Sequence, residues 1–230
     1  VKEPGELERI EEACRLADAA FERILQVLRP GLTEREVALE LEFFMRREGA
    51  EATSFDSIVA AGPRGALPHA RPTDAVLQEG QFVVLDFGCV LDGYCSDMTR
   101  TVVIGKADGR MREIYDLVLR AQEAGIAAVR AGADQVAVDR AARAVIEAAG
   151  YGEQFGHGLG HGVGLEVHED PPRLSHTAPS RPLEAGMVHS VEPGIYLPGW
   201  GGVRIEDLVQ VTEDGCRILS HASKELLEIS

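Results

Sequence analysis

The sequence predicts an α/β (α+β) fold made of two related halves, each with two helices followed by a β-hairpin. Apolar residues recur at helical spacing in four segments, and two further segments are rich in β-branched and aromatic residues, as strands are. The second set of elements repeats the first in the same order. We therefore expect one domain over residues 1–230, with half-repeats of about 1–105 and 106–230 that pack around a pseudo-twofold axis.

The elements of the first half follow one another closely along the chain. They are a helix over 6–28, a second helix over 33–48, a strand over 55–61, a loop over 62–81 and a hairpin over 83–104. Pro30-Gly31 ends the first helix, and Thr33 with Glu36 forms a capping box that starts the second. The loop is rich in glycine, proline and arginine and contains His69.

The first hairpin is predicted to turn at Asp92-Gly93, because a type I′ turn needs positive φ at both central residues. In that register Asp86 faces Thr99 and Asp97 faces Gly88, and strand alternation puts these side chains on one face. Two carboxylates on an otherwise apolar hairpin are costly unless a cation or hydrogen-bond donors compensate. Taken alone, the pattern fits a metal site or a solvated strand face.

The second half repeats this arrangement. Its elements are predicted as helices over 111–129 and 134–149 and a hairpin with arms over 187–196 and 203–212. A shift of 106 residues carries Asp86 onto Glu192, and Glu206 in the second hairpin corresponds to Asp97. Each half therefore supplies two carboxylates. The four acids meet at the centre if the halves are related by a twofold axis; alternatively, the duplication is ancient and the acids lie on the surface.

A glycine-rich segment before the second hairpin holds His157, His161 and His168. Alternate glycines disfavour a helix and allow close approach of the backbone, and neutral imidazole is a good ligand for divalent metals. The segment can therefore overhang the acid cluster, although the spacing does not say which histidine binds a metal.

Other polar residues near the predicted centre have more than one interpretation. Surface positions are expected, on base rates, for His69, His176 and His221. His189 alternates with Ser190 on its strand and should point away from the carboxylates. Arg204 shares a face with Glu206, where a guanidinium can hold a carboxylate or a substrate, or form a structural ion pair.

Composition narrows the class of protein. The net charge of −15 argues against general binding of nucleic acid or anionic membranes, and no apolar run approaches the about 18 residues of a membrane span. The four cysteines, Cys14, Cys89, Cys95 and Cys216, lack zinc-type spacing. We interpret them as reduced thiols of a cytoplasmic protein.

The combined motifs resemble those of the pita-bread metallopeptidases, and most closely those of Xaa-Pro aminopeptidases and prolidases. The motifs are Asp86-Phe87-Gly88, Ser96-Asp97-Met98-Thr99-Arg100-Thr101, His157-Gly158-Leu159-Gly160-His161, Val167-His168-Glu169, Val191-Glu192-Pro193-Gly194-Ile195-Tyr196 and Val203-Arg204-Ile205-Glu206-Asp207. The resemblance covers essentially the whole chain and implies a pita-bread fold with a curved, mostly antiparallel sheet.

The resemblance also assigns roles to residues. It implies metal ligands at Asp86, Asp97, His161, Glu192 and Glu206. It implies catalytic roles for His69, His157, His168 and Glu192, and substrate contacts from Arg204 and His157. The family usually has Phe-Thr where this chain has His189-Ser190, so the hydroxyl is kept. The separate amino-terminal domain of full-length relatives is expected to be absent.

The implied activity is hydrolysis of the bond between an N-terminal residue and proline, by an Xaa-Pro aminopeptidase or dipeptidase. The implied cofactors are two divalent ions, usually manganese, with cobalt, iron and zinc as alternatives. Expected partners are short peptides with proline at the second position and a second copy in a homodimer, with neither nucleic acid nor membrane. Two alternatives remain: a methionine aminopeptidase, and an inactive peptide-binding module of the same fold.

Overall fold

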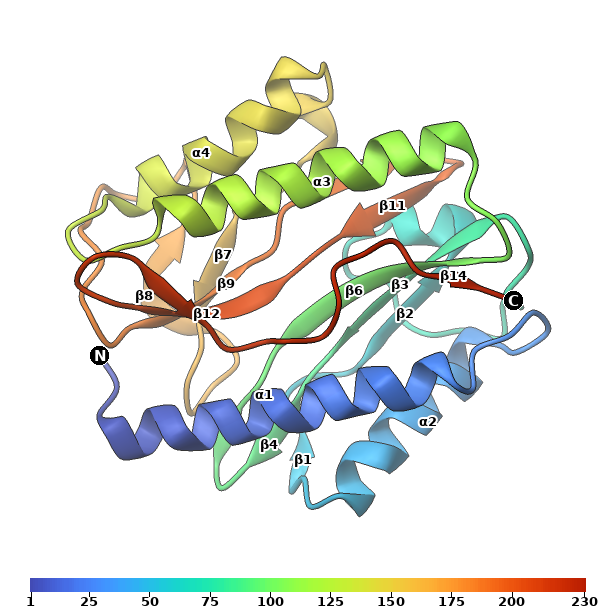
Figure 1. Cartoon of the computed structure of the whole chain (residues 1–230), viewed down its shortest axis with the longest axis horizontal. Helices are drawn as coiled ribbons and strands as arrows, with labels where there is room; N and C mark the ends of the chain where they lie inside the picture. The colour runs from blue at the N-terminus through green and yellow to red at the C-terminus, as the bar shows by residue number, and fades with distance from the viewer.

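The structure is a computed structural model that describes residues 1–170 and 173–230 in full, with 171 and 172 described only by their place in strand β8. The first half contains α1 (Pro4–Leu25), α2 (Glu34–Arg47), β1 (Ala52–Thr53), β2 (Ile58–Ala61), the 3₁₀ helix η1 (Gly62–Ala66), β3 (Gln81–Phe87), β4 (Cys89–Leu91), β5 (Tyr94–Cys95) and β6 (Met98–Ile104). The second contains α3 (Gly109–Ala128), α4 (Gln135–Ala148), η2 (Gly152–Gln154), β7 (Gly160–Gly162), β8 (Glu169–Leu174), β9 (Val188–Val191), β10 (Gly194–Leu197), β11 (Gly201–Arg204), β12 (Asp207–Val211), β13 (Cys216–Ile218) and β14 (Glu228–Ile229). In Figure 1 the strands lie between α1 and α2 at the bottom and α3 and α4 at the top.

The first hairpin has the predicted register. Strand β3 pairs antiparallel with β6 and places Asp86 opposite Thr99. Strands β4 and β5 continue the same register up to the turn, where Asp92 has φ 47° and Gly93 has φ 78°. Between the two pairs the hairpin is interrupted at Gly88. A Cβ there would lie 2.0 Å from the carbonyl oxygen of Ser96, so only glycine allows this approach.

The second half repeats these connections. Strands β9 and β12 pair antiparallel, as do β10 and β11. Backbone hydrogen bonds repeat as well: Gly31 N–H donates to the carbonyl of Leu77 at 3.0 Å, and Gly132 N–H donates to that of Leu183 at 2.8 Å. The duplication seen in the sequence is therefore a duplication of structure.

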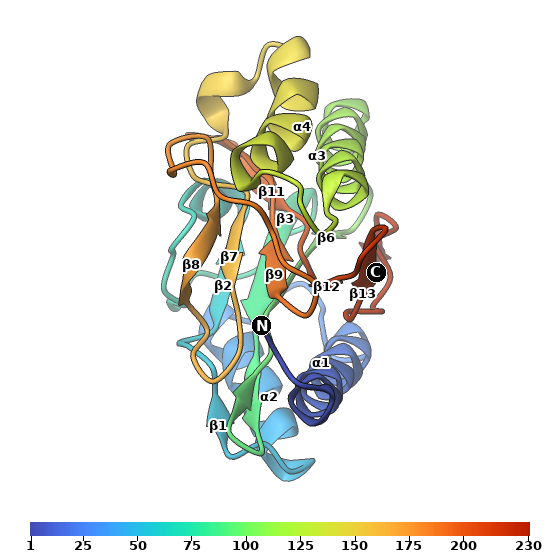
Figure 2. The same ribbon diagram turned by 90° about the vertical axis from the view of Figure 1, so that its left-hand side faces the viewer.

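The halves meet along β6 and the segment that joins β11 to β12. Glu206 N–H donates to the carbonyl of Thr99 at 3.1 Å, and the hydroxyl of Thr101 donates to the carbonyl of Arg204 at 2.9 Å. Strand β14 then crosses back and pairs with β6 in parallel orientation. Figure 2 shows this C-terminal segment on the same side of the strands as α1 and α3.

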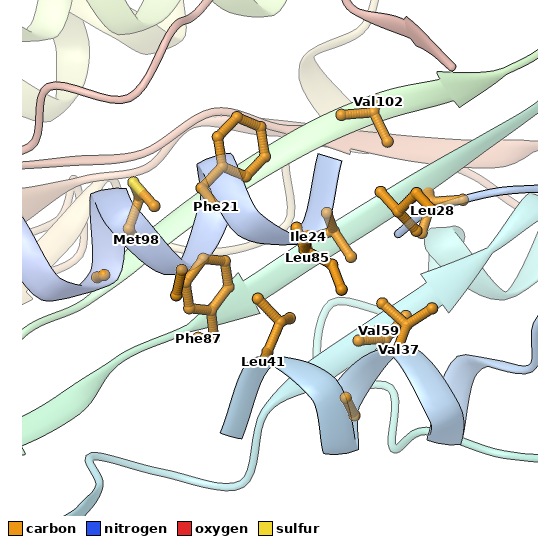
Figure 3. Packing of buried hydrophobic residues seen from close by; sticks show 14 of the residues in the cluster. Phe21, Ile24, Leu28, Val37, Leu41, Val59, Leu85, Phe87, Met98 and Val102 are labelled. Atoms are coloured by element: carbon orange, nitrogen blue, oxygen red, sulfur yellow. The ribbon is translucent and has the colours of Figure 1, made fainter. Parts of the chain in front are cut away.

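Each half has its own apolar core under its own helices. In the first half, Phe21 and Ile24 of α1 and Leu41 of α2 pack on Leu85 and other residues of the strands (Figure 3). In the second half, residues of α3 and α4 such as Ile114 and Ala142 pack against strand residues such as Val191. The predicted helices are confirmed to within a few residues, because their amphipathic faces supply these cores.

Several short strands differ from the prediction. The strand expected over 55–61 begins only at Ile58. Strands β1, β7, β8, β13 and β14 were not predicted. Their pairing depends on partners far away in the chain, which local periodicity does not report. Among the residues that the structure describes, no helix is long and apolar enough to cross a membrane.

Candidate metal centre and active site

The five expected metal ligands converge on one pocket from the ends of short strands. Their elements are β3 for Asp86, the link between β5 and β6 for Asp97, β7 for His161, the link between β9 and β10 for Glu192, and the link between β11 and β12 for Glu206. Asp97, Glu192 and Glu206 lie in short links between strands, whereas Asp86 stays in the β3 ladder opposite Thr99, next to the interruption at Gly88. The structure therefore brings together all five residues that the sequence singled out.

A close backbone contact sets the position of His161. A Cβ at Gly160 would lie 1.9 Å from the carbonyl oxygen of Ser190 on β9, a contact that only glycine permits. The hydroxyl of Ser190 accepts the N–H of His161 at 3.0 Å and donates to Oε1 of Glu192 at 3.0 Å. One serine thus orients two of the expected ligands.

Three of the expected ligands lie close enough to one another to hold one metal ion. One ligand atom each from Asp97, His161 and Glu206 lies within 4.8 Å of the other two. Nε2 of His161 lies 3.5 Å from Oδ2 of Asp97 and 3.3 Å from Oε1 of Glu192. The sequence left open whether His157 or His161 approaches the acids, and the geometry places His161 there.

Two carboxylate oxygens in this cluster have no hydrogen-bond partner among the described residues. They are Oδ1 of Asp86 and Oε1 of Glu206, and both are buried. The second oxygen of each of these two carboxylates accepts a hydrogen bond. Oδ2 of Asp86 accepts from Arg204 at 2.5 Å, and Oε2 of Glu206 accepts from the hydroxyl of Thr99 at 2.6 Å. Buried, unpartnered carboxylate oxygens that face one pocket are what a cation site requires, so the donor set fits divalent metal ions.

The electrostatics of the cluster favour a cation. Burial, with the charges of Glu206 and the other acids, raises the pKa of Asp97 well above its ordinary value. Burial and Glu192 likewise raise the pKa of Glu206, and burial raises that of Asp86 against the opposing charge of Arg204. Four carboxylates held this close repel one another, and a bound cation relieves that repulsion.

His161 and Glu192 form a strongly stabilised pair in the cluster. Burial opposes the charge of His161, but the hydrogen bond and charge of Glu192 outweigh it and raise the pKa of His161 to about 9. Burial likewise opposes the charge of Glu192, and His161 lowers the pKa of that carboxyl to about 2. An imidazole ligates a metal only when it is neutral, so an ion at this position would take the place of the proton on Nε2.

The pocket above these acids has a volume of about 540 Å³ and is also lined by the expected catalytic histidines. His69 reaches it from the loop after η1, and His168 from the start of β8. The ring of His168 lies against that of His161, with centroids 4.2 Å apart. Burial and the charge of His161 lower the pKa of His168. His69, expected at the surface on base rates, is exposed but lies at this pocket, as the resemblance implied.

A second polar group lies beside the acids. Nε2 of His157 lies 2.8 Å from the hydroxyl of Tyr196, to which Nη1 of Arg204 donates at 2.9 Å. Burial lowers the pKa of His157 and raises that of Tyr196 to about 12. Tyr196 was missed as a site residue. Strand alternation, which puts it on the face of Glu192, was the signal that could have identified it.

Comparison with known proteins gives consistent matches. Metallopeptidase family M24 matches residues 8–213. The chain is 45% identical over 227 residues to an Xaa-Pro dipeptidase of Pyrococcus furiosus. This match covers 99% of this chain and 65% of that protein. Among solved structures, an Xaa-Pro dipeptidase from Bacillus anthracis matches with a TM-score of 0.96 at 49% identity, over 99% of this chain and 64% of that one. An X-Pro aminopeptidase from Thermotoga maritima also has a TM-score of 0.96, at 44% identity, over 100% of this chain and 64% of that one.

These matches confirm the pita-bread fold, whose two halves enclose the acids. The chain spans less than two thirds of the length of these relatives, so the match describes part of each of them. The matched region includes both hairpins and the histidine segment that form the pocket. The chain belongs to metallopeptidase family M24.

Proposed function

We propose that the protein is a dinuclear-metal exopeptidase that hydrolyses the peptide bond between an N-terminal residue and proline. The observation that supports this most directly is the convergence of Asp86, Asp97, His161, Glu192 and Glu206 on one pocket, with buried carboxylate oxygens that lack partners. The relatives named as Xaa-Pro dipeptidases and aminopeptidase favour proline at the second position. The assignment of these five residues as ligands is part of the proposal.

The donor set favours hard or borderline divalent ions. Four carboxylates and one imidazole suit manganese, iron or cobalt better than a metal that prefers thiolates, and we propose manganese. When bound, two such ions supply an activated water near neutral pH and polarise the scissile carbonyl group.

The protein's own side chains would then handle protons and position the peptide. Both contacts of Glu192, with Ser190 and with His161, use Oε1, which leaves Oε2 to accept a proton and pass it to the leaving nitrogen. For a prolyl bond that nitrogen is a secondary amine, so its protonation is required for departure. His168 and His69, at the pocket wall, would donate hydrogen bonds to the peptide on either side of the reacting carbon.

The proline side of the substrate would contact His157 and Arg204, which line the pocket and are both hydrogen-bonded to the hydroxyl of Tyr196. Tyr196 and Arg204 are buried, and their mutual hydrogen bond fixes the orientation of the phenol. The ring of Phe155 lies edge-on against His157, with centroids 5.1 Å apart, which holds the imidazole in place. A rigid wall of this kind suits the pyrrolidine ring, which has few conformations of its own.

The assay compares three classes of peptide on metal-stripped protein with manganese added back. Hydrolysis of a Gly-Pro dipeptide indicates a dipeptidase, whereas hydrolysis of Gly-Pro-Xaa tripeptides alone indicates an aminopeptidase. Cleavage only of Met-led peptides without proline supports the methionine aminopeptidase alternative. Failure to bind manganese, together with no turnover of any peptide, supports the inactive binding module. Glu192→Gln is the control for contaminating peptidases, and it should lose turnover in every active case.

Three further predictions accompany this function. The cytoplasmic location is supported by four free cysteines, of which Cys14, Cys89 and Cys95 are buried. We also propose that residues 1–230 act as a single catalytic domain and that it forms a homodimer. Size-exclusion chromatography with light scattering tests the dimer.

A further inference from the structure

Glu34, the first residue of α2, is a buried carboxylate that lies outside the pocket. It is 0% exposed, and Oε1 accepts the N–H of Ala61 at 2.9 Å. Oε2 accepts the N–H of Thr73 at 3.0 Å and its hydroxyl at 2.8 Å. Nε of Arg64 lies 3.0 Å from Oε1 and 2.9 Å from Oε2. Such a set of donors offsets the loss of hydration that a buried charge suffers.

The helix itself does not need this carboxylate. The start of α2 is already capped by Thr33 and Glu36, each of which accepts a backbone N–H of the other. Glu34 points elsewhere, toward a segment that lies well beyond α2 in the chain. The Glu34 side chain therefore serves that segment and not the start of α2.

All the donors come from the two ends of residues 61–73, which carry His69. Ala61 ends β2 and Arg64 lies in η1, whereas Thr73 follows His69. Arg64 strengthens the link because its Nη2 donates to the carbonyl of Arg71 at 2.7 Å. One buried carboxylate thus connects both ends of the segment to α2.

The middle of the same segment contacts the centre. Nη1 of Arg204 donates to the carbonyl of Pro68 at 3.3 Å, directly before His69, while Nη2 contacts Asp86. Near η1, a Cβ at Gly202 would lie 2.1 Å from the carbonyl oxygen of Gly65, so this segment lies directly against β11. The segment that carries His69 is therefore held by Glu34 at its ends and by Arg204 in its middle, beside the pairing of Ala61 with β3 and the hydrogen bond from the N–H of Arg35 to the carbonyl of Thr73.

We propose that Glu34 is a positioning residue, which holds the segment 61–73 so that His69 lies at the pocket. This inference rests on the proposed function for the role of His69, whereas the connection between Glu34 and the segment does not depend on it. Helix α2 is fixed in the first core by Val37 and Leu41. The hydrogen bonds of Glu34 therefore attach the loop that carries His69 to a rigid helix.

In the second half, the first residue of α4 also holds a segment far away in the chain. Gln135 is the first residue of α4, lies 101 residues after Glu34 and is 2% exposed. Its Oε1 accepts the N–H of Arg173 at 3.1 Å, and its Nε2 donates to the carbonyl of Pro179. Here one donor and one acceptor require an amide, whereas in the first half donors alone surround the side chain and require a carboxylate. The chemistry of each residue thus matches the segment that it holds.

Glu34→Gln removes the support with a minimal change of shape. In either orientation of the amide, its NH₂ group faces a backbone N–H, that of Ala61 or that of Thr73. Glu36→Gln is the matched control, because it makes the same substitution two residues away on an exposed side chain of the same helical turn. Thr73→Val is a milder variant that keeps the carboxylate and removes one of its donors, the Thr73 hydroxyl, which also accepts the N–H of Ala75 at 3.2 Å. Thr73→Ser restores both hydrogen bonds.

The first test is amide hydrogen exchange on the full chain without added metal, which needs no activity. In Glu34→Gln, exchange of residues 62–73 should rise about tenfold or more, the effect of one lost charge-assisted hydrogen bond, while β3 and β6 stay protected. Glu36→Gln should leave these residues unchanged, and Thr73→Val should raise their exchange where Thr73→Ser does not. Unchanged exchange in both Glu34→Gln and Thr73→Val would overturn the proposal. If Glu34→Gln fails to fold, the Thr73 pair decides alone.

The second test is a double-mutant cycle on the manganese-loaded enzyme. Glu34→Gln should lower kcat about tenfold in the wild-type background and less than about twofold when His69 is already alanine, because the two substitutions act on one contact. Equal losses in both backgrounds would show that Glu34 acts without His69 and would refute the positioning role. If no peptide is hydrolysed, the proposed function fails, while the exchange result still tests whether Glu34 holds the segment.

Discussion

Replacing His189 with phenylalanine should stabilise the protein, and more so in acid than at alkaline pH. His189 lies on β9 and is 0% exposed. Within the described part of the chain, neither of its ring nitrogens has a hydrogen-bond partner of good geometry. Burial, together with the charge of Lys2, lowers the pKa of His189 to about 3, and the backbone of His161 opposes this only in part. A phenyl ring fills a similar volume without a polar group that needs a partner.

The expected magnitude has two parts. Removing buried polar atoms without partners should raise the free energy of unfolding by about 1–3 kcal/mol at pH 8. The second part depends on pH: between the folded pKa of about 3 and the ordinary value of 6.5, the unfolded chain binds a proton that the folded chain does not. Wild-type stability therefore falls as the pH drops below 6.5. At about pH 5 the gain from the variant should be about 2 kcal/mol larger than at about pH 8.

Urea unfolding of chelator-treated protein at both pH values measures this difference. His221→Gln serves as the matched control, because it also removes one histidine but at an exposed position. Acids in the centre titrate in the same range, but they are shared by all three proteins and cancel in the comparison. A His189→Phe protein that is less stable than wild type at pH 8, or that keeps the wild-type difference between the two pH values, would refute the reasoning.

Three other substitutions test separate features. Asp97→Ala should reduce the bound manganese from two ions per chain to one or none, by elemental analysis, and abolish turnover; undiminished turnover would remove Asp97 from the ligand set. Arg100→Met should lower the free energy of unfolding by about 3 kcal/mol, because it removes the guanidinium that donates to the buried Asp207 and to the carbonyl of Ala222, while Lys224 keeps its contact with Asp207. Arg217→Met at the surface should cost less than about 1 kcal/mol. Gly160→Ala should weaken manganese binding in titration calorimetry, because the added Cβ would collide with the backbone of β9. Gly215→Ala is the control and should keep the wild-type affinity, because a Cβ there has no described neighbour within 4 Å. Equal affinities of the two variants would contradict the packing argument.

The first hairpin shows what local sequence determines. Asp92-Gly93 selects a turn type, the turn sets the register, and the register places Asp86 opposite Thr99, so this part of the site could be predicted without the rest of the fold. The prediction that the second hairpin also contributes carboxylates to the site depended on the internal repeat. Glu192 was identified because it follows the same glycine and apolar pattern as Asp86.

Other features of the site depend on contacts that no local pattern reports. Spacing did not distinguish His161 from His157, because both lie between glycines, and their partners, Glu192 and Tyr196, come from elsewhere in the chain. The support from Glu34 was missed for the same reason. A glutamate in the first turn of a helix is ordinarily read as a favourable charge near the helix dipole, and only the fold shows that it is buried.

The contact between β14 and β6 also bears on how the chain reaches its native state. Strand β6 is buried along its whole length. The edge of β6 that faces away from β3 is covered by residues 227–229 and by the N–H of Glu206, which donates to the carbonyl of Thr99. While the chain is being synthesised, the first half therefore emerges with an apolar edge strand that has no neighbour, a form prone to aggregate. The residues that protect this edge follow the whole second half in the chain and are therefore made after it.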